Sequence, residues 1–250
     1  MVAVVTPGTA LIDFIGYGTR DPLVVFLGIE EKDAGGGDCA LQVRQTQFQP
    51  VEDLLRGCTL LAQCPGFVNP FTPGAATVPQ WNMASRFRLA LAELPWADAW
   101  DQHWRRYLGR NRQLGTVEGD TLLMECFAEP ATGEHVERAR ERVWPERRVA
   151  LERFLATIEP LYVVAYGAAP GRYVADLFPV VMSGYQGTQR QWHPLSTRQP
   201  SSIGRTAAHT VVARVAFFGN GRFNLADVEP IVAAMMVLGT GAAPLRHEWP

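Results

Sequence analysis

The sequence predicts a single α/β domain with a mainly parallel sheet of about four strands. Four short apolar runs, most of them rich in valine, are typical of strands that are buried on both faces. Segments with the apolar spacing of helices lie between these runs, and such an alternation favours a parallel sheet. The four runs are residues 23–27, 121–124, 161–165 and 211–218.

The predicted helices follow from apolar residues that recur every three or four positions. Gly57 weakens the first helix, Pro145 suits the first turn of a later one, and Pro230 predicts a kink in the last. The predicted helices are residues 51–63, 81–94, 134–142, 146–158, 168–178 and 225–238.

Stretches rich in proline, glycine and serine mark the connections. Residues 64–79 predict a long surface loop, and residues 180–205 predict a loop with one weak strand. Residues 1–21 predict an irregular arm that includes a short strand, and residues 239–250 predict a loose tail. The sequence contains no internal repeat or linker, so residues 1–250 are expected to form one domain.

The composition bounds the class of protein. With 250 residues, of which 47% are hydrophobic and 19% charged, the chain is long enough for a large core and too apolar for overall disorder. The formal net charge of −2 provides no global basic field, so nucleic-acid binding would need a local basic patch. Neither a signal-peptide layout nor a run of about 18 uncharged apolar residues is present, so we expect a cytoplasmic protein outside the membrane.

The four cysteines predict no metal site, because they form no CxxC pair and no spacing typical of zinc or iron–sulfur ligands. We expect free thiols in a reducing cytosol, and neither a metal nor another cofactor. The cysteines are Cys39, Cys58, Cys64 and Cys126.

A candidate site follows the first predicted strand. The apolar run ends at Gly28 and leads into the carboxylates Glu30, Glu31 and Asp33, which three glycines follow at residues 35–37. In open α/β sheets, ligands bind beyond the carboxyl ends of the strands, so Glu30 lies where chemistry is usually done. A solvated acidic loop after a core strand is the alternative interpretation, and the sequence leaves both open.

Residues 96–112 interleave arginines with tryptophan and tyrosine, a pattern that could hold a phosphate backbone and stack on bases. An amphipathic helix with an aromatic inner face and solvated arginines is the preferred interpretation of this segment. The single histidines His193 and His209 lie in predicted loops and are expected to be structural rather than catalytic.

Residues 146–174 run from a helix through a proline into a valine-rich strand, and then through glycine and small residues into the next helix. This pattern resembles the uracil-DNA glycosylase superfamily. Residues 23–37 are similar to its first motif, a strand ending in Gly-x-carboxylate or amide before a Pro/Gly-rich loop. Together with residues 121–130 and 211–238, the resemblance spans most of the chain after residue 20. It implies a three-layer α/β/α fold.

The resemblance also implies roles for individual residues. The acidic or amide residue that positions the attacking water in the family corresponds to Glu30, and Glu31 is a neighbour that could replace it. The family's base-reading amide corresponds to Glu125. An ionised carboxylate accepts hydrogen bonds but donates none, so Glu125 does not reproduce the match of an amide to uracil.

The last strand of the family delivers a histidine, and this chain has Phe217 or Phe218 there. Losing one such donor typically costs about 10²–10³ in rate, which argues against uracil excision. Asn220 falls near the family's serine, and Arg222 offers positive charge to a departing base or a phosphate. Phe48 is a further candidate for stacking on a flipped base.

These residues predict a divergent glycosylase-like enzyme of DNA repair, which hydrolyses the N-glycosidic bond of a damaged or unusual base. Its partner would be DNA, single-stranded or damaged, or a nucleotide. The alternative is a catalytically inactive binding module on the same fold. A flavodoxin-like protein that binds a phosphate at residues 35–37 ranks last, because the loop lacks phosphate-binding spacings and its neighbouring carboxylates repel anions.

Overall fold

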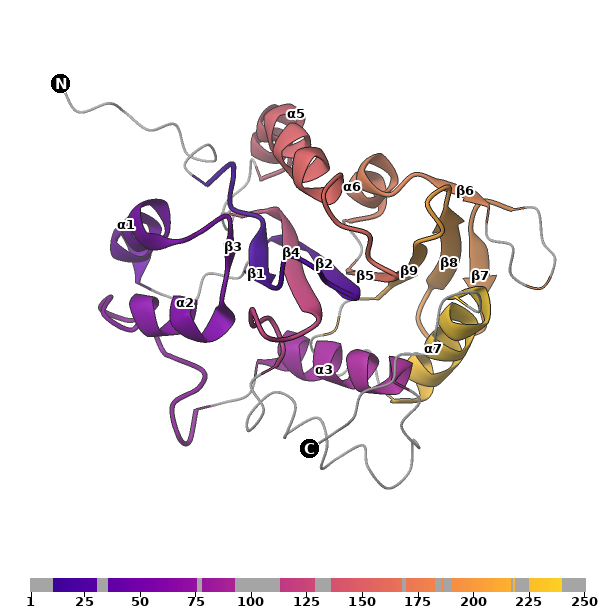
Figure 1. Cartoon of the computed structure of the whole chain (residues 1–250), viewed down its shortest axis with the longest axis horizontal. Coiled ribbons are helices and arrows are strands. Elements are labelled where there is room, and N and C mark those ends of the chain that lie inside the picture. The colour runs from indigo at the N-terminus through magenta and orange to yellow at the C-terminus, as the bar shows by residue number, and fades with distance from the viewer. Residues whose placement is uncertain are drawn as a thin grey trace.

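The structure is a computed structural model that describes ten parts of the chain. Nine strands and six helices lie in these parts (Figure 1). The described residues are 11–30, 36–75, 78–92, 113–128, 136–167, 170–182, 186, 190–216, 218 and 225–239. The strands are β1 (Gly16–Gly18), β2 (Val24–Glu30), β3 (Val51–Glu52), β4 (Thr121–Phe127), β5 (Tyr162–Tyr166), β6 (Val180–Met182), β7 (His193–Leu195), β8 (Ser201–Thr206) and β9 (Val211–Val215). The helices are α1 (Gly37–Gln47), α2 (Leu54–Leu61), α3 (Pro79–Leu91), α5 (Val136–Leu155), α6 (Pro170–Leu177) and α7 (Leu225–Gly239).

The strands form one mixed sheet, in the order β3-β1-β4-β2-β5-β9-β8-β6, with β7 paired to β8. Its centre is the run β4-β2-β5-β9, in which all neighbours are parallel. The α/β prediction with a mainly parallel centre is confirmed, and all four predicted strands lie in this run. The predicted count of four is wrong, because five further strands of the described part extend the sheet on both sides of this run.

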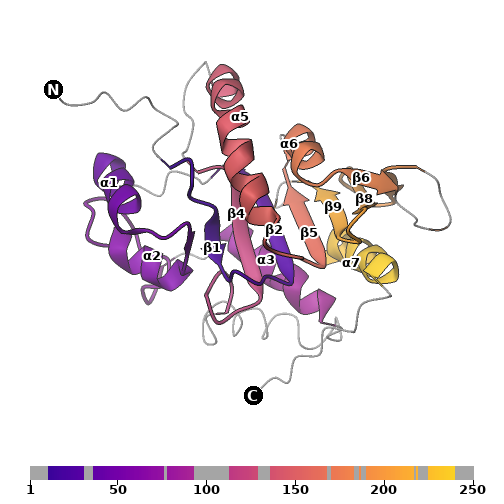
Figure 2. The same cartoon turned by 45° about the horizontal axis from the view of Figure 1, so that its top comes forward.

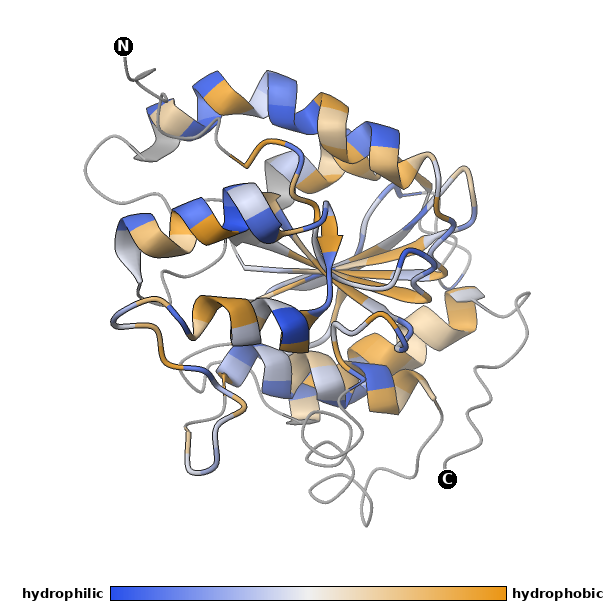
Figure 3. Cartoon of the chain, turned by 60° about the vertical axis from the view of Figure 1, so that its left-hand side comes forward, coloured by the Kyte–Doolittle hydropathy of each residue, from blue (hydrophilic) through white to orange (hydrophobic). Residues whose placement is uncertain are grey.

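Helices cover both faces of the sheet, with α5 and α6 on one face and α3 and α7 on the other (Figures 1 and 2). Because successive residues of a strand point to opposite faces, β2 supplies both cores. Phe26 packs in the core that includes α3 and α7, whereas Leu27 packs in the core that includes α5 and α6. Figure 3 shows hydrophobic strands at the centre and mixed hydropathy on the surrounding helices.

Several helix predictions need correction. The segment that begins at residue 51 forms the short strand β3 before α2, and the Asp53 carboxylate caps α2 by accepting from the backbone N–H of Arg56 at 2.9 Å. Helix α5 is continuous through Pro145, where the sequence predicts a break between two helices. The Trp- and Arg-rich residues 96–112 lie outside the described residues.

The region 180–205 contains three strands where the sequence predicts a loop with one weak strand. Strand β8 pairs with β9, β6 and β7, all antiparallel, so its backbone donors and acceptors are satisfied by neighbours although its sequence is polar. His193 lies in β7, and His209 lies in the turn between β8 and β9.

The prediction of free thiols is wrong for one pair of cysteines. Cys39 of α1 and Cys64, which follows α2, form a disulfide with a Cα–Cα distance of 5.6 Å. The pair meets because Ala40, Val43 and Leu61 pack these two helices against each other. Cys58 and Cys126 are free and buried.

None of the helices in the described part of the chain is both long and apolar enough to cross a membrane.

Candidate functional site

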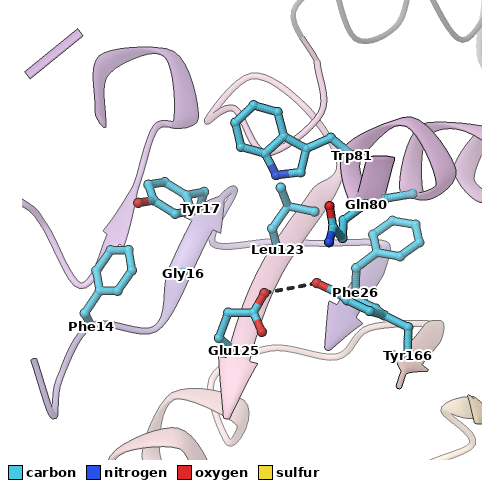
Figure 4. Close-up of a pocket in the computed structure, with 10 residues that line it drawn as sticks. Phe14, Gly16, Tyr17, Phe26, Gln80, Trp81, Leu123, Glu125 and Tyr166 are labelled. Atoms are coloured by element: carbon cyan, nitrogen blue, oxygen red, sulfur yellow. Dashed lines mark hydrogen bonds between the residues drawn. The ribbon is translucent and has the colours of Figure 1, made fainter. Parts of the chain in front are cut away.

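A recess opens at the carboxyl end of the parallel strands, on the sheet face that α3 covers (Figure 4). Its volume of about 60 Å³ is room for a few water molecules. We call it the Glu125 recess, after the carboxylate among its lining residues. These are Phe14, Gly16, Tyr17, Phe26, Gln80, Trp81, Ala84, Leu123, Glu125 and Tyr166.

The polar centre of the recess is a hydrogen bond between two strands that are not neighbours. The Tyr166 hydroxyl, at the end of β5, donates to Glu125 Oε1 of β4 at 3.0 Å. Strand β2 runs between β4 and β5, with Gly28 paired to Glu125. A Cβ at Gly28 would lie 2.6 Å from the carboxyl carbon of Glu125. The carboxylate therefore leans across β2 to reach Tyr166 only because residue 28 has no side chain.

Stacked aromatic rings hold Tyr166 in this position. The Tyr166 and Phe218 rings stack with centroids 4.5 Å apart and an interplanar angle of 14°. Phe218 in turn stacks on Phe87 of α3, with centroids 5.4 Å apart. Both phenylalanines are buried, so the phenol ring has one face against hydrocarbon and its hydroxyl directed at Glu125.

The first turn of α3 lies over the recess. Pro79 occupies the first helical position, where its fixed φ suits a helix start, and it brings Gln80 and Trp81 to the recess. In Figure 4 the Gln80 carboxamide is seen between Leu123 and Phe26, and it points toward the Glu125–Tyr166 pair. Its amide makes no hydrogen bond to any residue that the structure describes. Trp81 stacks on Phe71, with centroids 5.6 Å apart.

Strand β1 forms the remaining wall. A Cβ at Gly16 would overlap the Leu123 carbonyl oxygen of β4, so glycine allows the two strands to approach closely at the recess. Phe14 and Tyr17 flank this glycine with ring centroids 5.2 Å apart. Phe48 packs behind them, 5.7 Å from the Phe14 ring and 6.1 Å from the Tyr17 ring.

A buried arginine fixes the end of β4 on the opposite side of the sheet. The Arg147 guanidinium of α5 donates to the carbonyl oxygens of Ile12, Glu125 and Cys126 at 2.7, 2.9 and 3.1 Å. Burial lowers its pKa to about 10, which leaves it protonated at neutral pH. Burial, aided by the neighbouring Glu125 charge, also raises the pKa of the Cys126 thiol far above its usual range. Cys126 is therefore a neutral packing residue.

The structure brings some of the predicted site residues to this edge of the sheet. Glu125 lines the recess, and Phe48 packs behind its wall without lining it. The backbone of Glu30 ends β2, two residues beyond Gly28, and pairs with Phe127. Phe218 is buried against Tyr166. The side chain of Glu30 is not described, and Glu31, Phe217, Asn220 and Arg222 lie outside the described residues.

Sequence reasoning did not find Tyr166, Gln80 and Trp81. A signal exists for Tyr166, because it is the last residue before Gly167 at the end of a predicted parallel strand, where ligand-binding residues gather. Gln80 and Trp81 lie at a helix start that no local pattern connects to β4. Their contribution depends on how α3 packs across the sheet.

The described residues contain no group of three or more His, Cys, Asp or Glu side chains that could hold a metal ion.

Neither a protein-family model, nor a characterised protein, nor a solved structure matches this chain.

Proposed function

We propose that the Glu125 recess binds a nucleobase, and that the chain is a divergent uracil-DNA glycosylase-like protein. In this proposal it hydrolyses the N-glycosidic bond of a damaged or unusual base in nucleic acid. The observation that carries the proposal is the Glu125–Tyr166 hydrogen bond, which lies in an aromatic recess at the carboxyl ends of parallel strands.

The lining suits a planar ring with a polar edge. Phe26, Tyr17 and Trp81 offer aromatic surface, whereas Glu125 and Gln80 offer a carboxylate and a carboxamide. A volume of about 60 Å³ is smaller than the roughly 150 Å³ of a cavity that encloses benzene. The recess therefore takes the edge of a base while the sugar stays at its mouth.

The chemistry would be the addition of water across the N-glycosidic bond. The water oxygen bonds to the sugar C1′, the C1′–N bond breaks, and the base leaves with a proton. Glu30 is the residue we assign to orienting this water, because its backbone lies two residues beyond Gly28 on the strand that passes under the Glu125 carboxylate.

The test is a base-release assay on single-stranded and mismatched oligonucleotides that contain uracil, hypoxanthine or an alkylated base. We expect release from at least one substrate and a loss of at least 100-fold in Glu30→Gln, on the usual scale of general-base catalysis. The matched control is Glu229→Gln, at an exposed position of α7. If the protein neither releases nor binds any of these bases, the proposal is contradicted.

A second candidate function is a binding module without turnover. It is favoured by Phe218, which follows β9 and is packed between Tyr166 and Phe87, since hydrocarbon cannot stabilise a departing base anion. Base binding that Glu30→Gln leaves unchanged, together with no base release, would support this candidate over the hydrolase.

A further inference from the structure

We infer that one face of the antiparallel wing of the sheet, the face that carries Arg214, binds the phosphate backbone of a single nucleic-acid strand. The wing consists of β6, β7, β8 and β9 and lies at one end of the sheet (Figures 1 and 2). The inference rests on the proposed function in one respect, the nucleic-acid substrate. It does not depend on base binding in the Glu125 recess.

The charge of the wing differs from that of the whole chain. The formal net charge of the chain is −2, but the sequence contains no Asp or Glu between Asp176 and Asp227. A protein without a global basic field needs a local excess of positive charge to hold phosphates, and this part of the chain has one. The arginines between the two aspartates are Arg190, Arg198, Arg205, Arg214 and Arg222.

Arg214 keeps its charge available for a ligand. Its guanidinium carbon lies 4.6 Å from the centroid of the Trp192 ring, and both side chains are partly exposed. Within the described part of the chain, Arg214 makes no hydrogen bond or ion pair. By contrast, Arg88 of α3 is paired with the Asp120 carboxylate. Trp192 therefore orients the Arg214 guanidinium without neutralising it, and the N–H donors of a guanidinium fit a phosphate.

The sheet holds Arg214 near its carboxyl edge. Arg214 is paired with Ala165 of β5 and with Ser202 of β8, so neighbouring strands fix its backbone on both sides. Tyr166, which lines the Glu125 recess, directly follows Ala165 and points to the other face of the sheet. A single strand that passes over this edge brings a phosphate to Arg214 while a neighbouring base enters the recess. This rigid position beside the recess favours nucleic acid over a membrane surface, which is usually held by amphipathic helices or polybasic segments.

The test is fluorescence anisotropy with the full-length protein and two labelled probes. One probe is a single-stranded DNA of about 12 nucleotides, within the usual range of single-strand site sizes. The other has the same length and consists of abasic tetrahydrofuran phosphates, so it carries phosphates and no bases. We expect both probes to bind. Arg214→Gln should weaken both about tenfold or more, the usual worth of a charge-assisted contact, and make the log–log salt slope shallower by about 0.7, the share of one phosphate.

Arg205→Gln is the matched control, because it removes the same charge from the other face of the same wing. Arg205 is paired with Val211, which packs in the core that includes α3 and α7. Val212, on the face of Arg214, packs in the core that includes α5 and α6. We expect Arg205→Gln to have a clearly smaller effect than Arg214→Gln on both probes.

Trp192 is a positioning residue in this inference. Trp192→Leu is expected to weaken both probes in the wild-type background and to have little further effect in Arg214→Gln, because the ring acts through the guanidinium. An undiminished effect of Trp192→Leu in the Arg214→Gln background would overturn this role. Circular dichroism of each variant shows whether its fold is kept.

Three results would overturn the inference: wild type binds neither probe, Arg214→Gln and Arg205→Gln have equal effects, or vesicles that contain phosphatidylserine bind more tightly than both probes. The proposed function is judged separately. If a base is released but Arg214→Gln leaves the affinity for both probes unchanged, the inference fails and the proposed function stands. If the abasic probe binds through Arg214 but no base is bound or released, the proposed function fails and the inference stands.

Discussion

At the scale of single residues, the recess depends on the missing side chain at Gly28. The Glu125 carboxylate occupies the space that a Cβ would take, and from there it reaches Tyr166 across β2. Any larger residue at position 28 would therefore displace the Glu125 carboxylate, which is the acceptor in the proposed base-binding site.

Gly28→Ala tests this displacement. We expect this variant to lose the proposed base binding. We also expect its free energy of unfolding to fall by about 1–3 kcal/mol, because the new methyl group overlaps the Glu125 carboxylate. The measurement is urea unfolding of the two single variants, Gly28→Ala and Glu125→Ala, and of the double variant. In the Glu125→Ala background the cost of Gly28→Ala should fall. Equal costs in both backgrounds would show that the carboxylate is not the obstacle.

Arg147 is expected to be the most sensitive single position for stability. Arg147→Met removes three hydrogen bonds and leaves the carbonyls of Ile12, Glu125 and Cys126 without this donor. We expect a loss of about 3 kcal/mol or more, at about 1–3 kcal/mol for each buried acceptor left unsatisfied. Arg153→Ala, exposed on the same helix, should change the urea midpoint little. Similar effects of the two substitutions would contradict this role.

Cys126 predicts a pH dependence of stability. Its pKa is raised in the folded state, so above the ordinary value of 9.0 the unfolded chain loses this proton and the folded chain keeps it. The contribution of Cys126 to the free energy of unfolding is therefore complete below pH 9. Above pH 9 it falls by up to about 1.4 kcal/mol per pH unit, the value for one proton. Urea unfolding between pH 8 and pH 10 should show a steeper decline in wild type than in Cys126→Ala. Parallel curves would refute this assignment.

At the scale of elements, the sequence is most informative where a strand is buried on both faces. The cores of β2, β4, β5 and β9 are continuous apolar runs, and all four were predictable. Strand β8 was not, because its polar sequence S-S-I-G-R-T is held by antiparallel neighbours on both sides. Its register depends on partners that are distant in sequence, which local periodicity does not report.

The residues of the Glu125 recess also differ in whether the sequence could place them. Glu125 could be placed from sequence because it lies near the carboxyl end of a strongly predicted strand. Gln80 and Trp81 could not, because their position depends on the packing of α3. The uracil-DNA glycosylase resemblance, the roles of Glu30, Glu31, Asn220 and Arg222, and the cytoplasmic location stay predictions.

The disulfide between Cys39 and Cys64 fastens α1 to the end of α2, and its two cysteines are 25 positions apart. Closing a loop of this length is worth about 3 kcal/mol in the free energy of unfolding. We expect dithiothreitol to lower the urea midpoint of wild type accordingly and to leave Cys39→Ser/Cys64→Ser unchanged. Mass spectrometry after alkylation of the urea-unfolded protein without reductant should find Cys58 and Cys126 modified and Cys39 and Cys64 unmodified. Modification of Cys39 and Cys64 under these conditions would contradict the bond.

At the scale of the whole molecule, the charge balance limits how strongly the protein would attract the nucleic acid of the proposed function. A formal net charge of −2 gives little long-range attraction for phosphates. We therefore expect affinity for single-stranded DNA to depend weakly on salt, with a log–log slope of about −2 or shallower, corresponding to about three neutralised phosphates. Fluorescence anisotropy between 50 and 200 mM salt, the range over which phosphate-dominated binding weakens by about 10³–10⁵, measures this slope. A much steeper slope would show that backbone contacts dominate.

The bridge from Tyr166 to Glu125 passes over an intervening strand, so no pair of adjacent strands contains it. Its two partners and the intervening Gly28 come from three chain segments that are not consecutive in sequence. A nascent chain emerging from the ribosome has no such bridge before Tyr166 has left the exit tunnel. Ligand capture during synthesis would therefore report that β4, β2 and β5 have assembled, and no fragment that ends before Tyr166 would acquire it.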